Sequence, residues 1–157
     1  MIKGLYIHIP FCDQICTYCD FCKMVTNDHI KNEYMKALVK ELEYYSDLVS
    51  NIETIYIGGG TPSSLDNELI EAFLVELEMI IDMSNIKEFT IETNPNDISE
   101  KFLTMIKNHH ITRISMGVQS LNENLLNFLG RTHKAETVFK AIELIKKSKI
   151  NYNLDFL

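Results

Sequence analysis

Residues 5–23, LYIHIPFCDQICTYCDFCK, join a short strand-like stretch to a loop that contains all four cysteines of the 157-residue chain. The stretch LYIHI has the apolar, β-rich composition of a strand. The first three cysteines have the spacing C-x3-C-x2-C. The residues before them are too few, and are interrupted too soon by Pro10, to form a secretory signal. Clustered cysteines in such a chain more often bind metal or carry out redox chemistry than form disulfides.

Further along the chain, short β-rich stretches alternate with longer segments of helical period. We expect strands at residues 5–9, 54–60, 88–93, 113–119 and 151–157, and helices at residues 30–49, 66–82, 99–109 and 136–148. In the expected helices, apolar residues recur at spacings of three and four. Four β-α units followed by a strand predict an α/β fold, a parallel sheet with helices packed outside it, arranged as a partial TIM-like (β/α) barrel.

The organisation of the chain predicts one domain over residues 1–157, because no linker or low-complexity segment interrupts the pattern. Leu157 falls inside an expected strand, with no helix after it to cover that strand. We therefore expect residues 1–157 to be the N-terminal part of a longer, truncated barrel. The alternative to a truncated barrel is that a partner protein covers the exposed edges of the sheet.

The charge balance argues against nucleic-acid binding. The chain carries 15 Lys and Arg against 22 Asp and Glu, a formal net charge of −7. Contacts to phosphates need clustered Lys and Arg, which this chain lacks. No apolar run approaches the roughly 20 residues that a transmembrane helix needs. We expect a cytoplasmic protein without a transmembrane segment.

The cysteine spacing predicts an iron–sulfur site. A zinc ribbon would need a second C-x2-C unit a dozen or more residues away, and a thioredoxin-type pair would leave the other cysteines without a role. Three thiolates in a compact loop can instead hold three irons of a [4Fe–4S] cluster. The fourth iron then has no protein ligand and stays open. Cys22 would close that open position if it were a ligand, so we expect it to be a bystander.

The sequence resembles the radical S-adenosylmethionine (SAM) superfamily, and within it the oxygen-independent coproporphyrinogen III oxidases and the HemW haem chaperones. Five segments in order carry the resemblance: YIHIPFCDQICTYCDF (6–21), GGGTPSSL (58–65), IETNPNDI (91–98), SMGVQSLNENLLNFLGRTH (115–133) and NLDFL (153–157). The resemblance implies that residues 1–157 are the N-terminal part of a radical SAM core domain. It also implies the cofactors, a [4Fe–4S] cluster and SAM, with SAM chelating the open iron and accepting an electron from the reduced cluster.

The resemblance further implies which residues form the site. It makes Cys12, Cys16 and Cys19 the cluster ligands. It assigns SAM contacts to Tyr6, Tyr18, Gly59, Gly60, Thr61, Glu92, Gln119, Arg131 and Asp155. Most of these positions follow an expected strand, where barrels of this kind place their sites.

Several of these residues also allow a plainer interpretation. Tyr6 could be a core residue and Tyr18 could serve loop packing alone. The glycines could form a tight turn between a strand and a helix, and Arg131 could be a solvated surface charge.

The histidines carry less information than the cysteines. His8 shares a face of its strand with Tyr6 by the period of two. It could act as a proton donor or tetrapyrrole contact near the cluster, or be a hydrogen-bonded core histidine. His109, His110 and His133 show no metal spacing, so we expect them at the surface.

Three functions are compatible with the sequence. An oxidase would decarboxylate coproporphyrinogen III, whereas a chaperone would bind haem and pass it to an acceptor protein; both would need an electron donor. Phe21 stands where the oxidases carry a further cysteine, and only eleven residues precede Cys12, where the oxidases have a long extension. These two features favour the chaperone. A non-functional fragment is the third possibility.

Overall fold

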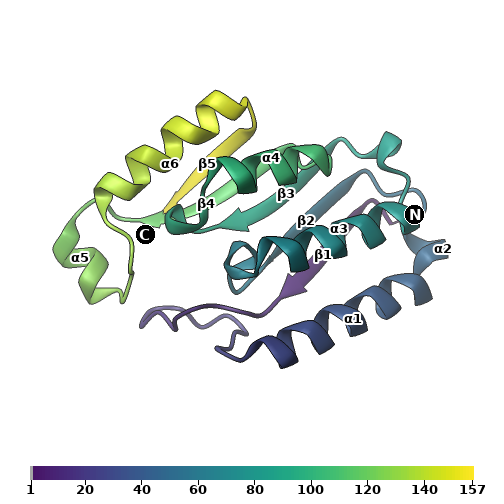
Figure 1. Cartoon of the computed structure of the whole chain (residues 1–157), viewed down its shortest axis with the longest axis horizontal. Helices are drawn as coiled ribbons and strands as arrows, with labels where there is room; N and C mark the ends of the chain where they lie inside the picture. The colour runs from purple at the N-terminus through teal and green to yellow at the C-terminus, as the bar shows by residue number, and fades with distance from the viewer. Residues whose placement is uncertain (1) are drawn as a thin grey trace.

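The computed structural model describes residues 2–157 and contains one five-stranded parallel sheet (Figure 1). The strands lie side by side in chain order: β1 (Gly4–Ile9), β2 (Thr54–Gly59), β3 (Glu88–Thr93), β4 (Arg113–Gln119) and β5 (Asn151–Phe156). The helices are α1 (Asp28–Tyr44), α2 (Ser46–Val49), α3 (Asn67–Ile80), α4 (Glu100–Asn108), α5 (Glu123–Phe128) and α6 (Ala135–Ser148). Every neighbouring pair of strands is parallel, which confirms the predicted α/β arrangement.

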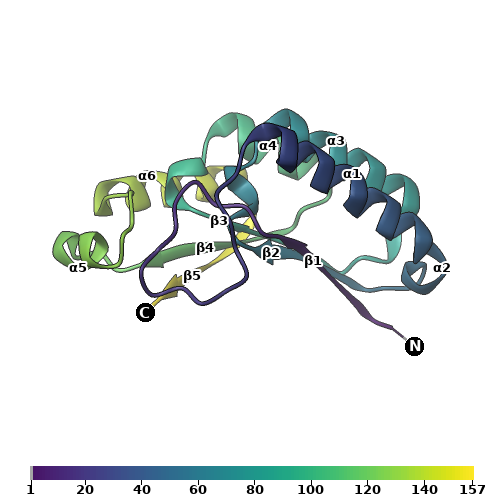
Figure 2. The same cartoon turned by 90° about the horizontal axis from the view of Figure 1, so that it is seen from below.

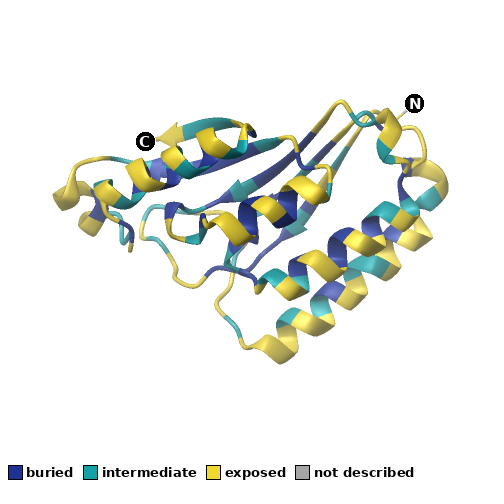
Figure 3. Cartoon of the chain, turned by 45° about the horizontal axis from the view of Figure 1, so that its top comes forward, coloured by how far each residue is buried: buried dark blue, intermediate teal, exposed yellow. Residues whose placement is uncertain are grey.

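The main helices cover one face of the sheet (Figure 2). Because side chains alternate along a strand, each strand turns its apolar residues toward these helices, as with the fully buried Ile7, Ile57 and Ile91. The outer faces of the helices are exposed (Figure 3). The opposite face of the sheet carries polar and aromatic residues, among them Tyr6 and Glu92. The uncovered face of the sheet is therefore the one suited to polar ligands.

The first expected helix needs correction. The helix expected at residues 30–49 is interrupted at Tyr45, whose backbone leaves helical geometry, so that α1 ends at Tyr44 and α2 follows. Two apolar residues of the expected helix, Ile30 and Tyr45, are exposed because they lie in the first turn of α1 and just beyond its end.

Helix α5 was not predicted. It begins after Asn122, whose side chain accepts hydrogen bonds from the backbone N–H groups of Asn124 and Leu125. An asparagine in this position is a common start signal for a helix, so the sequence did contain a cue. Six residues are too few for a clear helical period.

The sheet is an open arc over residues 2–157, since β1 and β5 pair with one neighbour each. Over the same residues, no helix combines the length and the apolar composition that crossing a bilayer would require.

Candidate functional site

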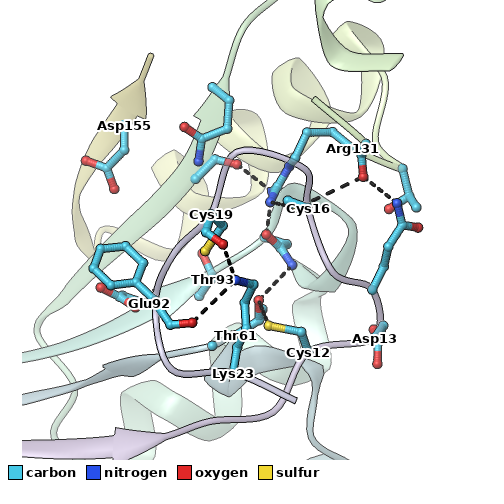
Figure 4. Close-up of a pocket in the computed structure, with 18 of the residues that line it drawn as sticks. Cys12, Asp13, Cys16, Cys19, Lys23, Thr61, Glu92, Thr93, Arg131 and Asp155 are labelled. Carbon is cyan, nitrogen blue, oxygen red and sulfur yellow. Dashed lines mark hydrogen bonds between the residues drawn. The ribbon is translucent and has the colours of Figure 1, made fainter. Parts of the chain in front are cut away.

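A cavity of about 420 Å³ lies where the cysteine loop passes the C-terminal ends of the strands (Figure 4). Its lining comes from the loop after β1, from the ends of β2, β3, β4 and β5, and from residues 130–132 after α5. Strands that run in the same direction bring their last residues to one edge of the sheet. Segments more than 100 residues apart therefore meet around this cavity.

The cysteine loop is anchored at its neck and at its tip. At the neck, Cys12 N donates to Met24 O (3.0 Å) and Met24 N donates to Pro10 O (2.7 Å). At the tip, Thr17 donates from its hydroxyl to Phe128 O (3.1 Å) and from its backbone N–H to Leu129 O (3.3 Å). The end of α5 thus holds the loop against the cavity.

Three of the four free thiols face this cavity. Cys12 is buried, Cys16 and Cys19 are half-buried, and all three line the cavity, whereas Cys22 is exposed and does not. Cys12 Sγ lies 3.6 Å from Thr61 Oγ1. Burial raises the pKa of the Cys12 thiol, and the contact with Thr61 opposes that rise.

The thiols are not arranged around one metal ion. Within residues 2–157, no three His, Cys, Asp or Glu side chains come close enough together to hold a single ion. A [4Fe–4S] cluster binds each cysteine through a different iron, so it does not require its ligands to meet at one point. Three free thiols on one cavity fit such a cluster better than a single ion.

Glu92, at the end of β3, is held by two donors. The Tyr56 hydroxyl donates to Oε1 (2.7 Å) and the Gly59 N–H donates to Oε2 (3.0 Å). Burial and the hydrogen bond to Glu92 raise the pKa of Tyr56 to about 12. The tyrosine therefore stays protonated and donating, and the carboxylate is fixed at the edge of the cavity.

Arg131 connects the cysteine loop to the strand ends. Nη1 donates to Cys16 Sγ (3.6 Å), and Nη2 donates to Gly117 O (2.9 Å) and to Asn94 Oδ1. The side chain is half-buried and its Nε is buried without a partner. The interpretation of Arg131 as a solvated surface charge is therefore wrong.

Residues 6–157 match the model of the radical SAM superfamily. The chain belongs to the radical SAM superfamily. Members of this superfamily bind a [4Fe–4S] cluster and SAM. The match covers nearly the whole chain, which agrees with the resemblance carried by its five sequence segments.

The curated relatives of this chain include proteins named heme chaperone HemW. The protein from Lactococcus lactis is 37% identical over 99% of this chain and 41% of its own length. The protein from Bacillus subtilis is 36% identical over 99% of this chain and 42% of its own length. This chain therefore spans about two fifths of these curated relatives, and its sequence is similar to that part of the HemW proteins.

A solved structure of coproporphyrinogen III oxidase (HemN) from Escherichia coli, described as a radical SAM enzyme, is similar in fold. The TM-score is 0.88 at 27% identity, over 99% of this chain and 37% of the oxidase. The partial barrel expected from the sequence is confirmed by this similarity.

The structure brings nearly all the residues implied by the radical SAM resemblance to one cavity. Its lining includes the three cysteines together with Tyr18, Gly59, Gly60, Thr61, Glu92, Gln119, Arg131 and Asp155. Asp155 accepts hydrogen bonds from the Ser115 hydroxyl (2.8 Å) and from Asn153 Nδ2 (2.7 Å). Gln119 ends β4 in the left-handed backbone region (φ 67°), which is uncommon outside glycine. Their roles as SAM contacts stay predictions.

Tyr6 and His8 lie beside the cavity rather than in its lining. They share one face of β1, as predicted, with Tyr6 OH 3.1 Å from His8 Nδ1. Tyr6 is 56% exposed and stacks on Tyr56, so it is not a core residue. His8 is half-buried, and its Nε2 lies 3.1 Å from Cys22 O.

Gly59 and Gly60 allow the end of β2 to lie close to the start of the cysteine loop. Gly59 has φ 122°, and a Cβ at Gly60 would lie 2.6 Å from Phe11 O. The N–H groups of Gly60 and Thr61 donate to Ile9 O (2.9 Å) and Phe11 O (2.7 Å). These residues therefore form a tight junction between β2 and the cysteine loop while also lining the cavity.

The prediction that all three later histidines lie at the surface is wrong for His133. This side chain is 3% exposed, and its Nε2 lies 3.0 Å from Val118 O, because the segment after α5 folds back along β4. Burial lowers the pKa of His133, and the charge of Arg131 lowers it further. His110 is exposed, whereas His109 is half-buried beside Glu71 and Glu78.

Several residues that line the cavity were not predicted from the sequence. Thr93 and Asn94 directly follow Glu92, so their place at the edge of the sheet was a usable signal. The Thr93 hydroxyl is buried without a hydrogen-bond partner, which suits a site that takes a polar ligand. Lys23 also lines the cavity, and nothing in the motif indicated it, because it lies after the last cysteine.

Proposed function

We propose that this chain is the portion of a HemW-like haem chaperone that holds a [4Fe–4S] cluster on Cys12, Cys16 and Cys19, with SAM in the adjoining cavity. One observation carries the proposal. Three free thiols from one loop line the same cavity as the carboxylates and the guanidinium at the strand ends. The names of the relatives from L. lactis and B. subtilis support haem as the ligand of the whole protein.

When bound, the reduced cluster supplies the electron that cleaves SAM. The residues of this chain would bind and orient that cofactor. Glu92 presents a carboxylate already ordered by two donors, which suits the ammonium group of SAM. Arg131 offers a planar guanidinium suited to the SAM carboxylate. Asp155, at the end of β5 in the cavity lining, offers acceptor oxygens for the ribose hydroxyls.

A second candidate is oxygen-independent coproporphyrinogen III oxidase. The similarity to the oxidase structure, with a TM-score of 0.88, favours it. Phe21 argues against it, since this residue occupies the position of the oxidases' further cysteine and lines the cavity with a largely exposed ring. In either function the partners would be haem or a porphyrinogen, together with an electron donor, and for the chaperone also a haem acceptor.

Anaerobic reconstitution with iron and sulfide tests the cofactor assignment. We expect about four irons per chain and the broad visible absorption of a [4Fe–4S] cluster. Cys12→Ser, Cys16→Ser and Cys19→Ser should each lose the cluster, whereas the matched control Cys22→Ser should keep it. A Cys22→Ser protein without a cluster would refute the assignment of ligands.

Two further measurements on the reconstituted protein separate the functions. Haem titration should give saturable binding if the protein is a chaperone. Incubation of coproporphyrinogen III with SAM and a reductant should then yield no decarboxylated porphyrin. Decarboxylated product would instead establish the oxidase.

A further inference from the structure

The side chain of Lys23 folds back into the cysteine loop instead of extending into solvent. Its Nζ donates hydrogen bonds to the carbonyl oxygens of Cys19 and Phe21, the latter at 3.3 Å (Figure 4). The side chain is half-buried and lines the same cavity as the three thiols. A long cationic side chain is thus placed inside the turn that carries the last predicted cluster ligand.

Lys23 and Arg131 are the two cations in the lining of this cavity. Arg131 is already engaged by Cys16, Asn94 and Gly117. Lys23 forms no ion pair with any residue of the described chain, 2–157. Its contacts are neutral carbonyl oxygens, so its positive charge is not cancelled by a neighbouring carboxylate.

We infer that Lys23 is a positioning residue for the cluster, which holds the turn around Cys19 and favours the reduced state of the cluster through its charge. The inference rests on the proposed [4Fe–4S] site. A cluster held by three thiolates carries net negative charge, and one-electron reduction by an external donor makes it more negative. A nearby cation stabilises the reduced state more than the oxidised one. The reduction potential of such clusters depends on local charge and hydrogen bonding.

The two parts of this role can be separated by substitution. Lys23→Arg keeps the charge and the donors. Lys23→Gln keeps a hydrogen-bond donor and removes the charge. Lys23→Met removes both while keeping an unbranched side chain. Lys40→Met, on the exposed side of α1, is the matched control for the loss of one positive charge far from the cavity.

The test is an anaerobic redox titration of each reconstituted protein, followed by electron paramagnetic resonance, with the rate of iron loss to a chelator measured in parallel. We expect the midpoint potential to become more negative in both Lys23→Gln and Lys23→Met and to stay at the wild-type value in Lys23→Arg and Lys40→Met. Iron loss should be several-fold faster in Lys23→Met than in Lys23→Gln.

Equal midpoint potentials in wild type, Lys23→Gln and Lys23→Met would overturn the electrostatic role, whatever the rates of iron loss. Equal rates of iron loss in Lys23→Gln and Lys23→Met would overturn the role in holding the turn. Wild-type protein that takes up no cluster would be a different result, because it would overturn the proposed function itself and this inference with it.

Discussion

The carboxylate of Glu92 is held in place by hydrogen bonds at the C-terminal edge of the sheet. Tyr56 and the Gly59 N–H each donate to a different oxygen of this group. Tyr56 lies on the uncovered face of β2 and stacks against Tyr6, so its hydroxyl is directed by packing on the sheet rather than by the cavity. Tyr56 is therefore a residue that would act on SAM through Glu92.

Tyr56→Phe should weaken SAM binding by roughly 5- to 10-fold, because one net hydrogen bond of about 1 kcal/mol is lost. Cluster content should not change. Equilibrium dialysis of SAM against the reconstituted protein measures the effect.

A double-mutant cycle with Glu92→Gln provides the control for this prediction. If Tyr56 acts through Glu92, the combined loss in Tyr56→Phe/Glu92→Gln should be smaller than the product of the two single losses. Multiplicative losses would contradict that mechanism.

His133 makes stability depend on pH. Burial lowers its pKa below the ordinary 6.5, so between 6.5 and the lower folded-state value the unfolded chain binds more protons than the folded one. This contribution to stability is present above pH 6.5 and is lost as the pH falls through the folded-state pKa. His133→Gln should flatten the decline in the free energy of unfolding between pH 7.5 and 5.5, as measured by urea denaturation.

The exposed His110 provides the comparison for His133. His110→Gln should leave the pH dependence of unfolding as it is in the wild type. The same slope in wild type and His133→Gln would show that another group is responsible for the decline.

At the scale of elements, helix α5, which follows β4, is hydrogen-bonded to the cysteine loop. Its C-terminal carbonyls accept the hydrogen bonds from Thr17 that hold the tip of the loop. Its N-terminus depends on the side chain of Asn122. A substitution that loosens the N-terminus of this short helix should therefore also weaken the hydrogen bonds between its C-terminus and the cysteine loop.

Asn122→Ala should lower the free energy of unfolding by about 1 kcal/mol, since it removes the N-cap. It should also speed the loss of iron to a chelator. Asn124→Ala, in the same helix and without a side-chain cap, should change neither quantity appreciably. Urea denaturation and a chelator assay on both variants give the comparison, and equal effects would contradict the linkage.

At the scale of the whole molecule, the hydrophobic core and the candidate site lie on different parts of the sheet. The apolar face is packed under the helices, whereas the site is assembled at the C-terminal edge from segments distant in sequence. A ligand at that edge contacts the loop and several strand ends at once. Its binding should stabilise the folded chain as a unit.

Removal of the cluster should therefore lower the melting temperature of the protein. Anaerobic thermal unfolding before and after chelation of iron measures this difference. Cys12→Ser should melt at the same temperature with or without prior reconstitution. An unchanged melting temperature in the wild type would indicate that the cluster does not bridge the loop and the strand ends.

The sequence alone determined the order of the five strands and of the four longer helices, the exact bounds of β3 and β4, and most of the residues that meet at the strand ends. The elements follow from short-range periodicity along the chain, and the site residues follow from the resemblance of the five motifs to the radical SAM superfamily. Because the strands are parallel, the motifs that follow them meet at one edge of the sheet.

The tertiary structure alone decided which partners the long side chains reach. Arg131 contacts a thiol 115 positions away, His133 is buried against β4, and Lys23 turns inward rather than outward. Flexible side chains can reach many partners, and the choice among them depends on how distant segments pack. For that reason three cysteines could be predicted as ligands from their spacing and from the family resemblance, but the charges and donors around them could not.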